Sequence, residues 1–308
     1  MRSADYHIPV LAEEVADGLR IAQVSRVVDG TLGDGGYSLC FLERSASVQV
    51  IGIDLDRDAI ERAGERLAGY GDRFRAVQGN FSDIDTLVGQ LGVEDLEAIV
   101  VDLGISRLQV TDPAKGFMFS KPGPLLMRMG GASRVDAGKI VNEWDEKMLA
   151  QLLWEYGEER RARWIARAIV RARSNNPITM TDELAEVVRR AVPHDHAVKS
   201  LARVFQAIRI AVNDELNNLR SFLPKALQLL RPQGRLAVVS YHSLEDRICK
   251  EFFASQIRPC TCPPDLPICV CGKQPTIRWV ERLVRPSEAE VQRNPNARSA
   301  KLRITERL

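Results

Sequence analysis

The sequence contains no apolar run that approaches the roughly 18 residues needed to span a membrane. Residues 1–7 also lack the apolar core of a secretory signal peptide. We therefore expect a cytoplasmic protein with no membrane partner, in which the six cysteines are reduced. There is no internal repeat, and a formal net charge of +2 excludes no class of partner by itself. The 308 residues, of which 45% are hydrophobic and 27% charged, suit one large domain with an insertion, or two domains.

One glycine-rich stretch organises the rest of the chain. Residues 29–37 read Asp-Gly-Thr-Leu-Gly-Asp-Gly-Gly-Tyr, after a β-branched run and before a helix-like segment. A strand, a glycine turn and a helix start form one end of a nucleotide-binding βαβ unit, where a side chain would keep the backbone from the ligand. Asp54 ends the next apolar strand about twenty residues on, where a carboxylate can bind ribose hydroxyls. A plain tight turn is the alternative interpretation.

The pattern of glycines indicates which cofactor this loop would hold. The third glycine of the dinucleotide fingerprint is missing. An acid, Asp29, instead stands ahead of the glycines, as in the class I methyltransferase loop that holds the methionine part of S-adenosylmethionine. A nicotinamide-dependent oxidoreductase is the weaker alternative, and it leaves the basic segment described below unexplained.

Apolar runs alternate with helix-like segments in the first hundred residues and return near the C-terminus. This alternation predicts a parallel sheet with right-handed crossovers. The run at 96–103 has the character of a central strand that is buried on both faces. The other strands are expected near residues 24–28, 48–54, 73–77, 235–240, 276–284 and 301–305.

Between these parts, residues 108–213 contain no convincing strand. Helical spacing predicts helices near 134–155, 157–173, 181–191 and 196–212, followed by another at 214–230. We therefore predict an α/β fold, a class I S-adenosylmethionine-dependent methyltransferase (Rossmann-like) sheet with an all-helical insertion domain. Its methyltransferase domain comprises residues 1–107 and 214–308, and the insertion, residues 108–213, recognises the substrate.

The insertion is basic. Residues 157–212 contain 11 Arg and Lys and 6 Asp and Glu, so the formal net charge of this segment is +5. A basic helix face suits the phosphate backbone of RNA, and a merely solvated face is the alternative. The predicted basic face carries Arg160, Arg163, Arg167 and Arg171, and the predicted core side carries Trp164, Ile165, Ala168 and Ile169.

Two polar residues follow buried strands at the predicted carboxyl edge of the sheet. Asp102 ends the run at 96–103, so it faces the crevice in which ligands bind in open α/β folds, with a helix N-cap as the alternative role. His242 follows the run at 235–240, and a structural histidine is the alternative there. Ser243 and Asp246 fit a capping box. Phe81, just past the third strand, either stacks beside an adenine or caps the core.

Four late cysteines form the pairs Cys260-Thr-Cys262 and Cys269-Val-Cys271. Four thiolates so close together could hold zinc tetrahedrally. The usual two-residue spacing of a zinc knuckle is absent, so the sequence favours a loop of reduced thiols and leaves zinc as the alternative. We predict no metal in the reaction.

With these residues identified, the chain resembles the bacterial ribosomal RNA small-subunit methyltransferase H (MraW) family over nearly its whole length. That family methylates N4 of a cytosine in the decoding centre of 16S rRNA, so the resemblance implies S-adenosylmethionine as cofactor and 16S rRNA in the small subunit as partner. We take Asp102 and His242 as the catalytic candidates. The cofactor contacts implied by position are Gly35, Gly36, Tyr37, Asp54, Phe81, Asp102 and Gln109. The motifs that carry the resemblance are His7–Leu11, Asp29–Gly36, Asp102–Ser106, Gly116–Ser120, Tyr156–Glu159, Phe205–Arg209, His242–Arg247 and Asn296–Ser299.

The chain departs from the family's usual pattern at a few positions. Tyr37 stands where the family usually has histidine, and Arg107 where it usually has serine. Two usual acids are replaced by Leu126 and Gly130. These losses motivate an alternative function, a non-catalytic RNA-binding or ribosome-assembly factor that retains the cofactor pocket. The sequence leaves a monomer or a homodimer open.

Overall fold

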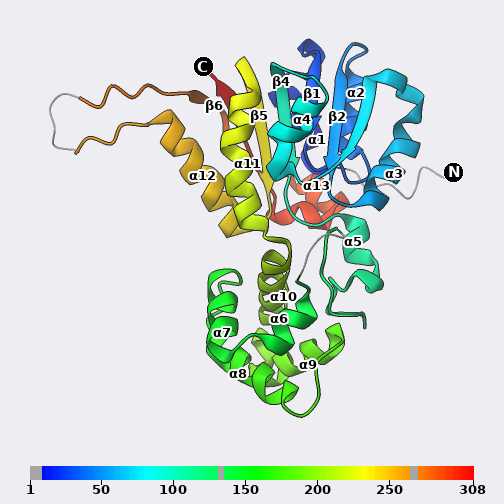
Figure 1. The fold of residues 1–308 in the computed structure, drawn as a ribbon, viewed down its shortest axis with the longest axis vertical. Helices are drawn as coiled ribbons and strands as arrows, with labels where there is room; N and C mark the ends of the chain where they lie inside the picture. Colours follow the sequence, from blue (N-terminus) through cyan, green and yellow to red (C-terminus); the bar gives the residue numbers. More distant parts are fainter. Residues whose placement is uncertain (1–8, 131–134, 264–269) are drawn as a thin grey trace. The chain divides into compact units, whose positions relative to one another are not determined.

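The computed structural model describes residues 9–130, 135–263 and 270–308. It divides into two compact units, one formed by Met1–Gly104 with Leu216–Leu308 and the other by Ile105–Glu215. The first unit carries the β-sheet and the second is helical (Figure 1). Within the described ranges, every helix falls short of the length and apolar character that crossing a membrane requires.

The first unit is built on a seven-stranded sheet in the order β3-β2-β1-β4-β5-β7-β6. Strands β1 to β5 pair in parallel, and β7 lies antiparallel to both β5 and β6. The predicted α/β class with a Rossmann-like sheet is therefore confirmed. The strands are β1 (Arg26–Asp29), β2 (Gln49–Asp54), β3 (Phe74–Gln78), β4 (Leu96–Asp102), β5 (Leu230–Ser240), β6 (Ile277–Val284) and β7 (Lys301–Arg307).

The centre of this sheet is buried because its strands are apolar on both faces. Ala98, Ile99, Val100 and Val101 of β4 are all fully buried, as expected for a strand with a parallel neighbour on each side. The helices of the same unit are α1 (Ala12–Gly18), α2 (Gly36–Arg44), α3 (Arg57–Leu67), α4 (Ile84–Gln90), α11 (Glu215–Leu229, whose first residue belongs to the second unit), α12 (Ser243–Ile257) and α13 (Glu288–Arg293).

The second unit has a hydrophobic core of its own, which contains Ile165 and Ile169 of α8, Leu184 of α9 and Val204 and Ile208 of α10. The helices of this unit are α5 (Arg107–Thr111), α6 (Ala137–Glu143), α7 (Glu146–Glu155), α8 (Ala162–Arg173), α9 (Thr181–Ala191) and α10 (Ala197–Asn213).

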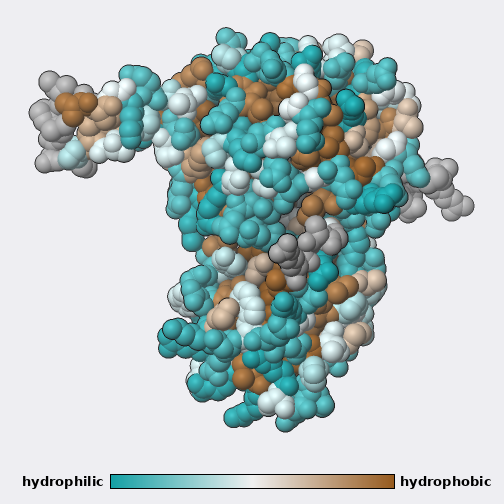
Figure 2. All heavy atoms as spheres, viewed as in Figure 1, coloured by the Kyte–Doolittle hydropathy of each residue, from teal (hydrophilic) through white to brown (hydrophobic). Residues whose placement is uncertain are grey.

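The face of the molecule seen in Figure 2 is mainly hydrophilic, with hydrophobic residues in smaller areas.

Two predictions about these helices are wrong. The segment predicted as one helix near 134–155 is two, because Asp145 caps a new helix by accepting a hydrogen bond from the main-chain N–H of Met148. The helix predicted to begin at residue 157 begins at Ala162. Glu158 adopts a left-handed backbone with φ of 49°, and a β-carbon on Gly157 would lie 2.7 Å from the Leu153 carbonyl, so this corner cannot be helical.

Candidate active site

The predicted acids meet at one edge of the sheet. Strand β1 ends at Asp29, β2 ends at Asp54 and β4 ends at Asp102, while Tyr241 directly follows β5. These strands run parallel, so their carboxyl ends lie at the same edge. Ligands bind at this edge in open α/β sheets. The edge therefore carries three carboxyl groups and one phenol beside the glycine loop.

The glycine loop begins in a space that admits no side chain. The main-chain N–H of Gly30 donates to the Val100 carbonyl of β4 at 2.8 Å. A β-carbon on Gly30 would lie 2.8 Å from Cγ1 of Val101, which is closer than carbon atoms approach. Gly35 ends the loop with φ of 75°, a left-handed conformation that favours glycine, and α2 starts at the next residue. The loop therefore presents bare backbone at the sheet edge.

Asp29, at the end of β1, connects the start of the glycine loop to α2. Its carboxylate is fully buried and accepts a hydrogen bond from the Ser38 hydroxyl of α2 at 2.8 Å. Burial raises the pKa of Asp29 to about 6, although the bond from Ser38 opposes the rise. The acid ahead of the glycines thus ties β1 to α2.

Asp54, at the end of β2, binds the main chain of the glycine loop at Gly33. Its carboxylate accepts from the main-chain N–H of Gly33 at 2.8 Å and from that of Asp56 at 2.8 Å. Burial raises its pKa, and these main-chain donors oppose the rise. Each carboxylate oxygen has a second lone pair, so both can still accept from a ribose hydroxyl.

The two predicted aromatic contacts differ in their surroundings. The Tyr37 hydroxyl donates to the Val10 carbonyl, and its buried ring lies 6.1 Å from that of Phe41. Its side chain thus belongs to the core, which leaves only its main chain for a cofactor. The half-buried ring of Phe81 packs edge-on against Phe222 at 5.3 Å. Its β-carbon would lie 3.6 Å from a β-carbon built on Gly30, so Phe81 stands beside the loop.

Asp102 is strongly perturbed by its burial at this edge. The Thr31 hydroxyl accepts a hydrogen bond from its main-chain N–H at 2.6 Å, and the Tyr241 phenol interacts with its carboxyl group in a way that favours the ionised form. Its Oδ1 atom is buried and has no hydrogen-bond partner within the described ranges. Burial raises the pKa of Asp102 to about 8, with smaller contributions from the charges of Asp29 and Glu245. A buried acceptor without a donor is costly, so this oxygen is suited to a ligand that supplies one.

His242 holds the start of α12. Its Nδ1 accepts from the main-chain N–H of Glu245 at 3.4 Å, and the Glu245 carboxylate accepts in return from the main-chain N–H of His242. The capping box predicted from Ser243 and Asp246 is therefore wrong by one residue. Asp246 instead accepts from Lys301 of β7 at 2.8 Å. The structure thus assigns His242 a capping role, while a role in the reaction stays a prediction.

Two residues of this network were not singled out from the sequence. Tyr241 follows a strand at the correct edge, and that position was the available signal. Glu245 lies inside a helix and within the motif His242–Arg247, but nothing in the sequence indicated a role of its own. The Glu245 carboxylate accepts from the main-chain N–H of Tyr241 at 2.8 Å, so it positions the phenol that binds Asp102.

Gln109 lies in the second unit, on α5. It forms a capping box with Ser106, and its Nε2 donates to the Met129 carbonyl at 3.3 Å. The side chain is buried among these partners. A cofactor contact by Gln109 stays a prediction.

The eleven basic residues between 157 and 212, all in the second unit, divide into two groups. In the first group, each cation has a partner: Arg167 pairs with Glu146, Arg189 and Arg190 with Glu186, Arg203 with Glu159 and Arg209 with Glu215, while Arg173 donates to the carbonyls of Val141 and Trp144. In the second group, no side-chain partner is found within the described ranges. This group comprises Arg160, Arg161, Arg163, Arg171 and Lys199.

Three of these unpaired cations line one pocket of about 600 Å³ in the second unit. Arg160 and Arg161 precede α8, and Lys199 lies in the first turn of α10. No side chain caps either helix N-terminus, so the positive ends of both helix dipoles add to the charge. The remaining lining residues are His196, Ser200 and Arg203.

The predicted core side of α8 needs one correction. Trp164 is 68% exposed, and α8 buries Ile165, Ala166 and Ile169 instead. Its indole lies on the outer side of the helix, in the same stretch as Arg163 and Arg167, which are both exposed. The predicted basic face therefore contains an aromatic ring.

The sheet order, with a glycine loop after β1 and acids ending β2 and β4, defines a class I methyltransferase fold. The chain belongs to the MraW methylase family, which matches residues 4–308.

Two curated relatives are both named Ribosomal RNA small subunit methyltransferase H. The relative from Carboxydothermus hydrogenoformans is 46% identical over 308 residues, which cover 98% of each chain. The relative from Symbiobacterium thermophilum is 45% identical over 310 residues, covering 99% of this chain and 98% of its own. Among solved structures, an rRNA methylase from Streptococcus thermophilus is 14% identical with a TM-score of 0.44, over 98% of this chain and 99% of that chain.

Proposed function

We propose that this protein transfers a methyl group from S-adenosylmethionine to the exocyclic N4 of a cytosine in the decoding centre of 16S rRNA. The family and the names of the relatives favour an rRNA methyltransferase. The observation that carries the proposal is the buried Oδ1 of Asp102, which has no hydrogen-bond partner within the described ranges and stands beside the glycine loop. A cytosine amino group would supply the missing donor.

The residues at the sheet edge fit S-adenosylmethionine. The main chain of Gly35 and Gly36, where the loop enters α2, would bind the methionine part, Asp54 would accept from the ribose, and Phe81, beside the loop, would contact the adenine. Tyr37 would contribute only its main chain, because its side chain is in the core. The cofactor supplies an electrophilic methyl group on a sulfonium.

Asp102 would act on the nucleophile. The lone pair of the cytosine amino group is delocalised into the ring, and an acceptor on its N–H favours the pyramidal nitrogen that can attack. Attack makes the nitrogen more acidic, so the proton can pass to Asp102 or to water without a strong base. Tyr241 would donate to the carboxyl of Asp102 and orient it, and the Glu245 carboxylate accepts from the main-chain N–H of Tyr241. The main contribution of the chain is to position these groups.

The helical unit would bind the RNA. The pocket formed by Arg160, Arg161 and Lys199 offers unpaired positive charge to phosphates. Trp164 offers an exposed ring on which an unpaired base can stack. Single-stranded or splayed RNA presents both features, and a cytosine must leave its stack to enter a crevice.

The test uses small ribosomal subunits from cells that lack the enzyme, purified full-length protein and labelled S-adenosylmethionine. Mass mapping of the 16S rRNA should find one new methyl group, on N4 of a single cytosine. The Asp102→Ala variant should lose this transfer, whereas Asp72→Ala, which removes an exposed acid elsewhere in the same unit, should keep it. Normal turnover by Asp102→Ala would contradict the role of Asp102. Binding of cofactor and RNA by the wild-type protein without transfer would favour an assembly factor.

A further inference from the structure

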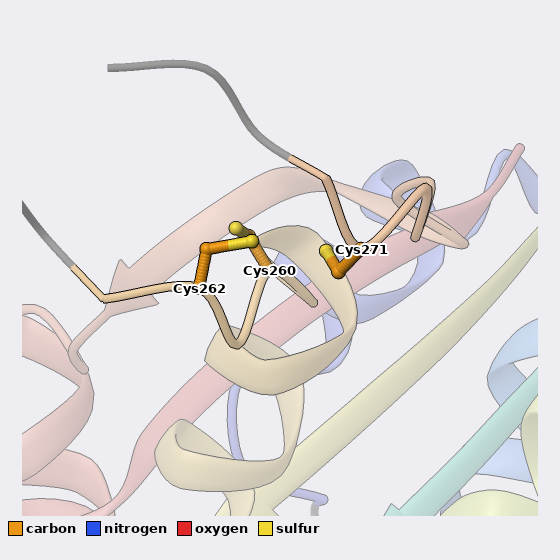
Figure 3. Close-up of side chains that lie close together, drawn as sticks. All are labelled: Cys260, Cys262 and Cys271. Carbon is orange, nitrogen blue, oxygen red and sulfur yellow. The ribbon is translucent and has the colours of Figure 1, made fainter. Parts of the chain in front are cut away.

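The loop between α12 and β6 carries three cysteines whose sulfur atoms converge. The Sγ atoms of Cys260, Cys262 and Cys271 all lie within 4.8 Å of one another. Figure 3 shows that Cys260 and Cys262 come from the outgoing limb of the loop, and that Cys271 on the returning limb points toward them. Cys269, the fourth cysteine of the pattern, lies outside the described residues, so the inference rests on the other three.

Hydrophobic burial does not explain why these side chains meet. None of the described residues in the ranges 258–263 and 270–276 is buried. Cysteine is ordinarily among the most buried residue types, yet Cys260 is exposed and the other two are only half-buried. The hydrogen bond from the Lys273 ammonium to the Thr261 hydroxyl, which joins the two limbs, is long at 3.4 Å. The three sulfur atoms thus come together in a part of the loop whose described residues are not buried.

The geometry suits a tetrahedral thiolate site. A zinc–sulfur bond of about 2.3 Å places neighbouring ligand sulfurs about 3.8 Å apart. Sulfurs within 4.8 Å reach that spacing by side-chain movements of about 1 Å or less. Gly272 directly follows Cys271 with φ of 65°, so the chain can turn away behind the ligand without strain.

We propose that this loop binds one structural Zn²⁺ through the thiolates of Cys260, Cys262 and Cys271. Each thiol that becomes a ligand loses its proton to solvent, so binding strengthens as pH rises. The ion would fasten the two limbs of the loop, whose described residues at 258–263 and 270–276 are not buried. This proposal is independent of the methyl-transfer function, because none of the three cysteines belongs to the carboxyl edge of the sheet.

The test measures metal on the reduced full-length protein. Mass spectrometry of the metal content should find about one zinc per chain in the wild type. The triple variant Cys260→Ser/Cys262→Ser/Cys271→Ser should hold less than a tenth of that amount. Cys40→Ser, which alters a half-buried thiol on α2, is the matched control and should keep the metal. Replacing zinc by Co²⁺ should give thiolate-to-metal charge-transfer absorption in the wild type and not in the triple variant.

Limited proteolysis gives a second readout that does not depend on activity. Chelation should speed cleavage in the loop at least tenfold, and added Zn²⁺ should reverse the effect in the wild type alone. Wild-type protein without zinc and without the cobalt absorption would overturn the proposal. Equal zinc content in the triple variant, or a disulfide between the limbs in protein kept under argon, would overturn it as well.

Discussion

The main-chain N–H of Tyr241 donates a hydrogen bond to the Glu245 carboxylate at 2.8 Å, and the phenol of the same tyrosine interacts with the carboxyl group of Asp102. Burial raises the pKa of the tyrosine well above its ordinary value, so the phenol stays protonated and remains a donor. The carboxyl group and its donor follow two neighbouring parallel strands, β4 and β5. The fold therefore brings together Asp102 and Tyr241, which are more than a hundred residues apart in the sequence.

The Tyr241→Phe substitution tests what this bond does. The bond from Tyr241 favours the ionised carboxyl, so its loss should raise the pKa of Asp102 further. We expect methyl transfer to fall about tenfold near pH 7 and to recover as the pH rises, because the acceptor is then ionised again. A pH profile of kcat/KM measures this shift. A uniform loss at every pH would show that Tyr241 acts only through packing.

Replacing Asp102 by Asn should stabilise the protein at alkaline pH. The pKa of Asp102 is about 8 in the folded protein and about 3.8 in the unfolded chain, so the folded state keeps a proton that the unfolded state releases between these values. Stability therefore falls as pH rises through this window in the wild type. Asparagine does not titrate and should avoid the loss.

Thermal unfolding at two pH values checks this expectation. The melting temperature of Asp102→Asn should exceed that of the wild type by at least about 3 °C at pH 8. The two proteins should differ by less than that at pH 5, where the folded wild type is protonated, so pH 5 is the internal control. A variant less stable than the wild type at pH 8 would mean that Asp102 is ionised in the folded protein without a ligand.

Cofactor binding should be linked to the same proton. A sulfonium charge at the sheet edge favours the ionised form of Asp102, so S-adenosylmethionine should bind more tightly as the pH rises toward 8. Calorimetry in buffers of different ionisation enthalpy measures the proton released. The amino group of the ligand titrates in the same pH range and releases protons of its own. The relevant quantity is therefore the number of protons released when the ligand binds to the wild type, minus the number released when it binds to Asp102→Asn. S-adenosylhomocysteine, which lacks the sulfonium, should show a smaller difference. Equal differences for the two ligands would contradict this linkage.

RNA binding should depend on the unpaired cations more than on the paired ones. The Arg160→Ala/Lys199→Ala double variant removes two charges from the pocket, and Arg189→Ala/Arg190→Ala removes two that pair with Glu186. If each pocket residue neutralises one phosphate, the slope of log K against log salt should fall by about 1.4 for the first variant. The second should change it by less than about 0.5.

This comparison also separates the pocket from the reaction. Affinity for S-adenosylmethionine should be unchanged in both variants, and the KM for RNA should rise with kcat kept in the pocket variant. Equal losses in the two double variants would mean that net charge, not the pocket, attracts the RNA.

The sequence predicted the sheet and its edge well because those features depend on local patterns. Apolar runs that end in Asp54 and Asp102 identify buried strands and their carboxyl ends without any knowledge of the partners. The same patterns could not reveal that the Tyr37 hydroxyl reaches Val10, or that Glu245 binds the main chain of Tyr241. Those contacts are set by packing across the unit.

The charges of the helical unit show a second reason why part of the site could not be predicted from the sequence. The sequence shows eleven basic residues between 157 and 212, but it does not show which of them are paired. Arg173 donates to two main-chain carbonyls, and Arg209 pairs with Glu215. These contacts depend on where the helices meet. Glu158 has a left-handed backbone before α8, and Trp164 is exposed although its neighbour Ile165 is buried. Which of two adjacent apolar residues packs inward depends on the helices around α8, which helical spacing alone does not specify.

The position of β7 bears on the order in which the chain can fold during its own synthesis. This strand, Lys301–Arg307, fills the gap between β5 and β6, and its Leu302, Ile304 and Thr305 are fully buried. Residues 105–215 can bury their own core as soon as they have emerged, whereas β5 keeps an open edge until residue 307 is made. The sheet is thus completed only after nearly all of the chain has been translated. The active edge of the enzyme depends on that late strand, because β5, which β7 closes, leads directly into Tyr241.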